Sequence, residues 1–158
     1  METSADTFIK LACVGGIDSG NVWDYFHSKI DQILIWYSSD VICCLQFLRR
    51  DLDCKTKLSP KYGGVGTSAT NFEAILVGGS VLEISGSFYG YCIRTLRIVT
   101  SSGTYGPYGT AKALYTPFSF KTPIGIVGFH GFYRPDYLSA IGVYIDTGSG
   151  SKVKKESF

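Results

Sequence analysis

Apolar and polar residues alternate in short runs along most of the chain, and this period of two is typical of β-strands. The clearest runs are Lys29–Tyr37 and Tyr91–Thr100. The most charged stretch, Arg49–Lys61, contains Pro60 and has no apolar stripe at helical spacing, so we expect a loop or an irregular sheet edge there. The other predicted strands are Phe8–Val14, Val22–Asp24, Val41–Leu48, Asn71–Leu76, Val81–Ser85 and Tyr115–Phe120.

Two further apolar runs, Ile124–Phe129 and Leu138–Ile145, are separated by Gly131–Tyr137, which is rich in aromatic and turn-forming residues. Strand-like runs joined by a glycine-containing loop predict a β-hairpin. Because this loop carries Tyr133, Arg134, Asp136 and Tyr137, we expect it to meet a ligand. Loops or turns are also predicted at the glycine-rich segments Gly15–Asn21, Tyr62–Gly66 and Gly103–Gly109.

The hairpin layout recurs in the chain. Val81–Val99 and Ile124–Ile145 both consist of an apolar run, a loop of aromatic residues and glycine, and a second apolar run, and Ile33–Leu48 is similar with a shorter turn. Three similar hairpins in one chain predict three packed sheets related by pseudo-threefold symmetry.

Composition supports a single all-β domain. The chain has 158 residues, among them 19 Gly, 11 Tyr and 10 Phe, and only 18% are charged. We place the domain at residues 8–146, between a loose N-terminal segment (1–7) and a flexible basic tail (147–158). The net charge of +2 is small, and no stripe of Lys and Arg accompanies the aromatic residues, so nucleic acid is not expected as a partner.

No pattern of catalytic or cofactor-binding residues stands out. The only histidines, His27 and His130, are interpreted as structural or exposed, and the serines lack the Gly-x-Ser-x-Gly context of a nucleophile. The segment Gly63–Thr67 lacks the lysine and the following helix of a phosphate-binding loop. We therefore expect neither an enzyme nor a bound cofactor.

The five cysteines are Cys13, Cys43, Cys44, Cys54 and Cys92. Their number is odd and none form a Cys-x-x-Cys pair, so we expect reduced thiols of an intracellular protein and no metal site. The sequence shows neither a signal peptide nor an apolar run long enough to insert into a membrane. We expect a cytoplasmic or nuclear location.

Several ordered motifs resemble the jacalin-related lectins of plants over about Phe8–Ile145. They are Trp23-Asp24 after a Gly-Gly pair, Ile33–Ile42, Tyr62–Gly64, Leu82–Gly86, Ile93–Leu96, Thr104–Gly109, Ile126–Gly131 and Ala140–Tyr144. The resemblance implies the β-prism I fold, with three four-stranded antiparallel sheets. It also implies carbohydrate binding without catalysis. Because the chain continues through its first glycine-rich loop, it is more similar to the mannose/glucose-type branch than to the galactose-type branch.

The resemblance places a sugar site at Gly20 and at the end of the last hairpin, Asp136, Tyr137, Leu138 and Ser139. The family motif has glycine where this chain has Pro135, and a carboxylate where it has Ser139; the loop is also one residue longer. Pro135 has no N–H to donate, and Ser139 has no charge with which to accept two hydroxyls. Asp136 is a candidate replacement for the missing carboxylate, and the alternative is that it only caps the turn after Pro135.

A second candidate carbohydrate site maps to Asp40, Val41, Gly63 and Gly64, where Cys43 replaces the family carboxylate. Both sites therefore depart from the motif in the same way. Tyr89, Tyr133 and Tyr137, on predicted loop tips, are candidates for stacking on a sugar or a partner.

Two functions remain open at this point. One is a lectin with a degenerate site for mannose-type glycans or glycoproteins; the other is a protein-interaction module that keeps the lectin fold without sugar binding. The resemblance also suggests a homodimer formed through exposed sheet edges and a role in defence or stress.

Overall fold

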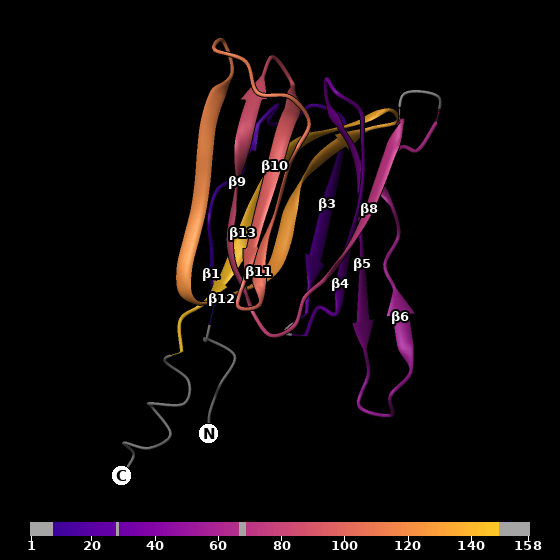
Figure 1. Cartoon of the computed structure of the whole chain (residues 1–158), viewed down its shortest axis with the longest axis vertical. Coiled ribbons are helices and arrows are strands. Elements are labelled where there is room, and N and C mark those ends of the chain that lie inside the picture. Colours follow the sequence, from indigo (N-terminus) through magenta and orange to yellow (C-terminus); the bar gives the residue numbers. More distant parts are fainter. Residues whose placement is uncertain (1–7, 28, 67–68, 149–158) are drawn as a thin grey trace.

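The computed structural model describes residues 8–27, 29–66 and 69–148, and these form an all-β structure without a helix (Figure 1). Accordingly, no membrane-spanning helix occurs in this part of the chain. The segment 1–7 and most of the predicted tail (149–158) lie outside the described residues.

The first face of the molecule is built on the second half of β12 (Thr116–Arg134). This half pairs on one side with β3 (Asn21–Phe26) and on the other with β13 (Tyr137–Asp146), all antiparallel. The outer edge of β13 is covered by two short strands, β1 (Phe8–Lys10) and β2 (Val14–Gly15). The face therefore has four strand positions, the outermost of which is interrupted.

The second face has the same plan. Its central hairpin is β4 (Gln32–Tyr37) and β5 (Ile42–Arg50), with β8 (Asn71–Leu76) on the outer side of β4. Two short strands, β6 (Thr56–Leu58) and β7 (Tyr62–Gly63), share the outer edge of β5.

The third face joins the hairpin of β9 (Val81–Tyr89) and β10 (Cys92–Thr100) to β11 (Gly103–Tyr108) and to the first half of β12. A register shift between Lys121 and Ile126 marks where β12 passes from this face to the first. Continuous hydrogen bonding through β12 joins two of the faces into one eight-stranded sheet. The predicted all-β prism of three four-stranded faces is thus confirmed.

Aromatic side chains from different faces meet in the core. The Trp23 and Tyr62 rings stack at 4.6 Å between centroids, and Phe47 stacks on Tyr25 at 4.6 Å and on Phe129 at 4.9 Å. All five residues are buried. Stacked aromatic pairs contribute beyond their buried area, so these pairs stabilise the packing of the first face against the second.

Several local predictions were wrong. Tyr62–Gly66 was expected to be a loop, but Tyr62 and Gly63 form the short strand β7. Gly103–Gly109 was expected to be a turn, but Gly103–Tyr108 forms β11, and a register shift opposite Leu96–Ile98 accommodates Gly106 and Pro107 at this sheet edge. The segment Gly131–Tyr137 was expected to be a loop, but β12 continues to Arg134 and only Pro135 and Asp136 turn. The predicted strand Phe8–Val14 is interrupted between Lys10 and Val14.

Candidate functional site

The three hairpin turns lie at one end of the prism (Figure 1). In each hairpin, one residue of the second strand has its carbonyl oxygen against a glycine of another segment, and the φ angle of that glycine is positive. A β-carbon at any of these glycines would crowd that oxygen, so the close backbone contact requires glycine. The pairs are Gly15 with Ser139, Gly63 with Cys43, and Gly109 with Arg94.

Each glycine-bearing segment also contacts the turn of a different hairpin, so the three tips support one another. A β-carbon at Gly16 would lie 2.7 Å from the carbonyl oxygen of Tyr91, and one at Gly64 would overlap the carbonyl oxygen of Pro135. The amide of Thr110 donates a 3.0 Å hydrogen bond to the carbonyl of Ser39. The tips therefore form a cyclic arrangement that follows the pseudo-threefold symmetry.

The structure brings Gly20 to the β12–β13 hairpin, as the sequence predicted. Gly20 has a φ of +94°, and a β-carbon there would overlap the carbonyl oxygen of Tyr133 and lie 2.8 Å from the Arg134 Cδ atom. Asp136 is exposed in the turn that follows. The exposed backbone of Gly20 and the exposed residue Asp136 thus lie on neighbouring parts of the same tip.

Leu138 and Ser139 do not lie in a loop; both belong to β13 and are fully buried. The Ser139 Oγ atom has no hydrogen-bond partner, while the Ser139 carbonyl accepts a 2.8 Å bond from the amide of Gly16. Their side chains therefore offer no surface to a ligand. Of the residues predicted here, Gly20, Asp136 and the half-buried Tyr137 remain accessible.

Asp136 lies toward the second predicted site. Burial raises the pKa of the Cys43 thiol, and the negative charge of Asp136 raises it further. The Cα atom of Asp136 is 3.4 Å from the position of a β-carbon on Gly64. The turn of the β12–β13 hairpin therefore brings Asp136 close to Gly64 of the second candidate site.

The second candidate site has few free backbone donors. The amides of Asp40 and Val41 bond to Ser38 Oγ at 3.1 and 3.2 Å, and the Gly64 amide donates to the Cys43 carbonyl at 3.1 Å. Cys43 itself is fully buried. The exposed acceptors at this site are thus the carboxylates of Asp40 and Asp136.

The three candidate stacking tyrosines differ in position. Tyr89 is exposed at its hairpin turn, whereas Tyr133 is half-buried in β12 with its ring 6.4 Å from that of Tyr62. Tyr137 interacts with the thiol of Cys92, whose pKa is nevertheless raised because burial disfavours the thiolate. Sequence reasoning did not single out Arg94 and Tyr115 as functional residues, although both contact Tyr89. The repeat Val81–Val99 could have indicated Arg94, whereas no sequence signal pointed to Tyr115.

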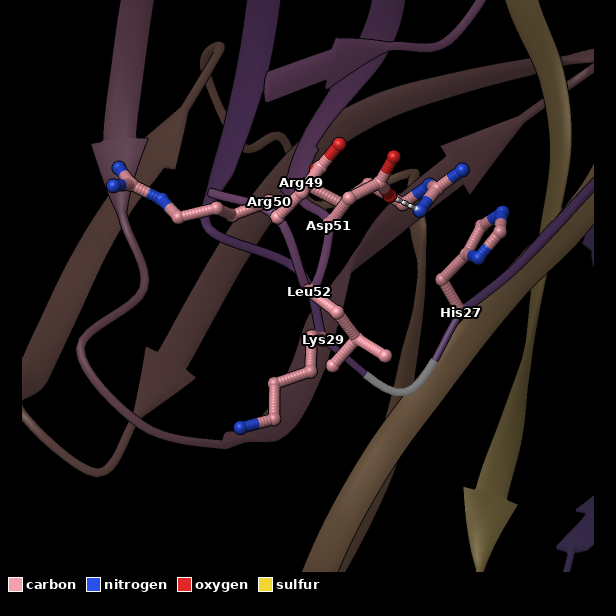
Figure 2. A pocket seen from close by; sticks show the side chains of 7 residues that line it. His27, Lys29, Arg49, Arg50, Asp51 and Leu52 are labelled. Carbon is pink, nitrogen blue, oxygen red and sulfur yellow. Dashed lines mark hydrogen bonds and ion pairs between the residues drawn. The ribbon is translucent and has the colours of Figure 1, made fainter. Parts of the chain in front are cut away.

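A hollow of about 540 Å³ lies at the opposite end of β5, lined by His27, Lys29, Arg49, Arg50, Asp51, Leu52 and Asp53. Figure 2 shows the His27 ring beside the ion pair of Arg49 and Asp51. Burial and the charge of Arg49 lower the pKa of His27. Because Asp51 also pairs with Lys57 at 3.8 Å and Arg50 pairs with Asp31 at 3.2 Å, the charges here are largely compensated.

Nothing in residues 8–27, 29–66 and 69–148 groups three His, Cys, Asp or Glu side chains as a metal site would require. His130 lies across Gly142, and its Nε2 atom is 2.7 Å from the Leu11 carbonyl oxygen, as expected for a structural histidine. All five cysteines are free thiols.

Comparison with known proteins gives one consistent result. Residues 11–144 match the model of the jacalin-like lectin domain. A mannose/glucose-specific lectin of Parkia platycephala is 33% identical over 87% of this chain, but this chain spans only 32% of that lectin. Protein RESTRICTED TEV MOVEMENT 1 of Arabidopsis thaliana is 30% identical, with 94% of this chain and 98% of the relative covered.

The fold comparison agrees. The crystal structure of Calsepa lectin in complex with a bisected glycan superimposes with a TM-score of 0.74 at 30% sequence identity. The match covers 89% of this chain and 98% of that one.

Proposed function

This chain belongs to the jacalin-like lectin family, and on that basis we propose that it is a non-catalytic carbohydrate-binding domain of the mannose/glucose type with a degenerate sugar site. The family and its fold are generally non-catalytic and bind carbohydrate. We place the site at the tip of the β12–β13 hairpin, where Gly20 and Asp136 are the principal contacts.

The proposal rests on the close approach of Gly20 to the Tyr133 carbonyl, next to the exposed turn of Asp136. A hexose has hydroxyls that both donate and accept hydrogen bonds. Gly20 is exposed, so its backbone can contact a sugar, and the Asp136 carboxylate can accept from hydroxyls through charge-assisted bonds. The Gly20 backbone and the Asp136 carboxylate would together bind hydroxyls that both donate and accept.

The relatives support the sugar class. Two Parkia relatives are named mannose/glucose-specific lectins, although this chain spans about a third of their length. Calsepa lectin has been crystallised with bisected and biantennary glycans. Mannose-type glycans or glycoproteins are therefore the ligands we propose to test first.

The alternative is a protein-interaction module that has lost sugar binding. It is favoured by the burial of Ser139 and Cys43, which occupy the motif positions of the missing carboxylates. The Arabidopsis relative that this chain spans almost entirely is not named as a lectin.

The deciding experiment is a titration of isotope-labelled protein with methyl α-mannoside, and in parallel with methyl α-galactoside, followed through the backbone amides by NMR. We expect saturable shifts with the mannoside at Gly20 and at Asp136–Ser139. If neither sugar moves any amide, the lectin proposal fails and the protein-interaction alternative replaces it.

We also propose that the chain forms a homodimer through a sheet edge. The edge strands β3 and β8 expose large apolar side chains, with Val22 73% and Leu76 65% exposed. Light scattering coupled to size-exclusion chromatography tests this directly, and a monomer mass at high concentration contradicts it. A cytoplasmic or nuclear location and a role in defence or stress also remain proposals.

A further inference from the structure

The tip of the β9–β10 hairpin carries a cluster of aromatic and basic side chains that differs from the other two tips. We call Tyr89, Tyr91, Arg94, Lys112 and Tyr115 the third-tip cluster. Tyr89 is 47% and Tyr91 68% exposed, and Lys112 is exposed as well. The segment that carries Lys112 is held beside the hairpin by a turn, in which the Tyr115 amide donates to the Lys112 carbonyl at 3.0 Å.

Arg94 is held at the centre of this cluster. Its Nε donates to the Tyr89 carbonyl at 3.3 Å and its Nη1 donates to the Asp40 carbonyl at 3.2 Å. Its guanidinium carbon lies 5.9 Å from the centre of the Tyr89 ring and 5.7 Å from that of Tyr115. The side chain is therefore oriented by four contacts with three residues, which reduces the conformational entropy lost when it binds a ligand.

Among the residues that the structure describes, the positive charge of Arg94 has no carboxylate partner. The ion pairs among the described residues all involve other side chains, and the bonds above use Nε and Nη1 only. The Lys112 Nζ atom adds a second positive charge 6.0 Å from the centre of the Tyr115 ring. Two cations without a carboxylate partner at one tip favour an anionic ligand.

The pseudo-threefold symmetry of the prism allows Arg94 to be compared with the equivalent residues of the other two tips. Arg94 is equivalent to Ser139 and Cys43, because each places its carbonyl against a glycine with positive φ. Ser139 and Cys43 are neutral and fully buried, whereas Arg94 is half-exposed and charged. The other tips offer acceptor carboxylates from Asp136 and Asp40, and this tip offers donors.

We propose that the third-tip cluster binds an acidic saccharide, a hexuronate unit whose carboxylate pairs with Arg94 and whose ring lies on the exposed tyrosines. The guanidinium group presents planar paired donors that match a carboxylate, and Lys112 adds charge beside it. The rings of Tyr89 and Tyr91 provide an apolar surface for the C–H face of a sugar, which a simple anion would not use. The residues of this site differ from Gly20 and Asp136, the principal contacts proposed for neutral hexoses.

The test is an amide NMR titration of the full chain with methyl β-glucuronide, compared at equal ionic strength with methyl β-glucoside, acetate and a diglutamate peptide. We expect saturable shifts at Tyr89–Arg94 and Lys112–Tyr115 with the glucuronide alone. Equal shifts with acetate would indicate simple anion binding and overturn the proposal. Equal shifts with the peptide would assign the tip to acidic proteins and also overturn it, as would an absence of shifts.

Substitutions within the third-tip cluster and at a control position test whether glucuronide binding depends on this cluster. We expect Arg94→Gln to weaken glucuronide binding at least about tenfold, with a smaller loss for Lys112→Gln. Arg94→Lys keeps the charge without the paired donors, so its loss should be intermediate. Lys10→Gln is the matched control, because Lys10 also lies over a tyrosine ring, 5.6 Å from the centre of Tyr144, in another face.

Lys112 is exposed, so Lys112→Gln still tests the site if Arg94→Gln fails to fold. Unchanged glucuronide affinity in folded Lys112→Gln and Arg94→Gln proteins would refute the site. The mannoside titration on the same samples reports on the β12–β13 tip, so failure of one proposal is distinguishable from failure of the other.

Discussion

The backbone of Gly64 lies directly against the carbonyl group of Pro135, so the glycine loop of one face supports the hairpin turn of another. This contact places Asp136 beside Gly64 and close enough to Cys43 for its charge to raise the pKa of that thiol. Asp136 and Ser139 belong to the same hairpin, but the Asp136 carboxylate is exposed in the turn whereas the Ser139 side chain is buried in β13.

We expect Gly64→Ala to lower the free energy of unfolding by about 1–3 kcal/mol, because the added methyl group must displace the turn at Pro135. Gly66→Ala is the matched control, since a β-carbon at Gly66 meets nothing within 4 Å. Its effect should stay within about 0.5 kcal/mol. Urea denaturation measures both changes, and equal stability of the two variants would contradict the packing described here.

Asp136→Ala should weaken mannoside binding about tenfold or more, because a hydrogen bond to a charged acceptor is lost. The measurement is the same amide titration by NMR. Asp53→Ala, at the opposite end of β5, should leave the sugar affinity unchanged. Unaltered affinity in the Asp136 variant would mean that Asp136 only caps its turn.

Ser139→Ala should raise the free energy of unfolding by about 1 kcal/mol, because it removes a buried hydroxyl that has no hydrogen-bond partner. Ser139→Asp should lower it by several kcal/mol, since a buried carboxylate would be left unpaired at this position. Thermal and urea unfolding report both effects. A loss of stability in the alanine variant would show that the Ser139 hydroxyl makes a stabilising contact.

Stability should fall as the pH decreases below about 6.5, the pKa of histidine in an unfolded chain. Burial lowers the pKa of His130 in the folded protein, and the hydrogen bond to Leu11 only partly offsets this. In this window the unfolded chain therefore binds the proton more readily than the folded chain does.

His130→Gln, which can still donate to Leu11, should reduce this pH dependence. His27 shows the same direction of shift, so His27→Gln should remove a further part of it. Urea denaturation between pH 5 and pH 7.5, as an approximate range around the histidine pKa, measures the slope. An identical slope in the double variant would contradict this explanation.

Thiol-modifying reagents should label Cys54 first, because it is the exposed cysteine. Cys43 and Cys44 should react far more slowly in the folded protein, since both are buried and burial raises the pKa of Cys44 to about 12. Mass spectrometry after timed alkylation gives the order. Early labelling of Cys44 would show that the hairpin β4–β5 opens readily.

Most strands could be predicted because alternation and turn residues are local signals. β8 lies where the pattern placed it, at Asn71–Leu76, and the hairpins Ile33–Leu48, Val81–Val99 and Ile124–Ile145 all form. Gly103–Tyr108 was missed because Gly106 and Pro107 normally end strands, whereas pairing with β10 and a register shift keep this segment in the sheet. Leu138 and Ser139 were predicted to contact a sugar because the sequence does not show that β13 buries both side chains.

By itself, the sequence determined the all-β class, the three hairpins and the glycines that their close contacts require, because these depend on spacing and on backbone freedom within short segments. Only the tertiary structure decided that Asp136 lies beside Gly64 and that Arg94 contacts the rings of both Tyr89 and Tyr115. It also decided that Ser139 is buried without a partner. These relationships join residues far apart in the chain, and they arise when the three faces pack around the aromatic core and bring their turns together.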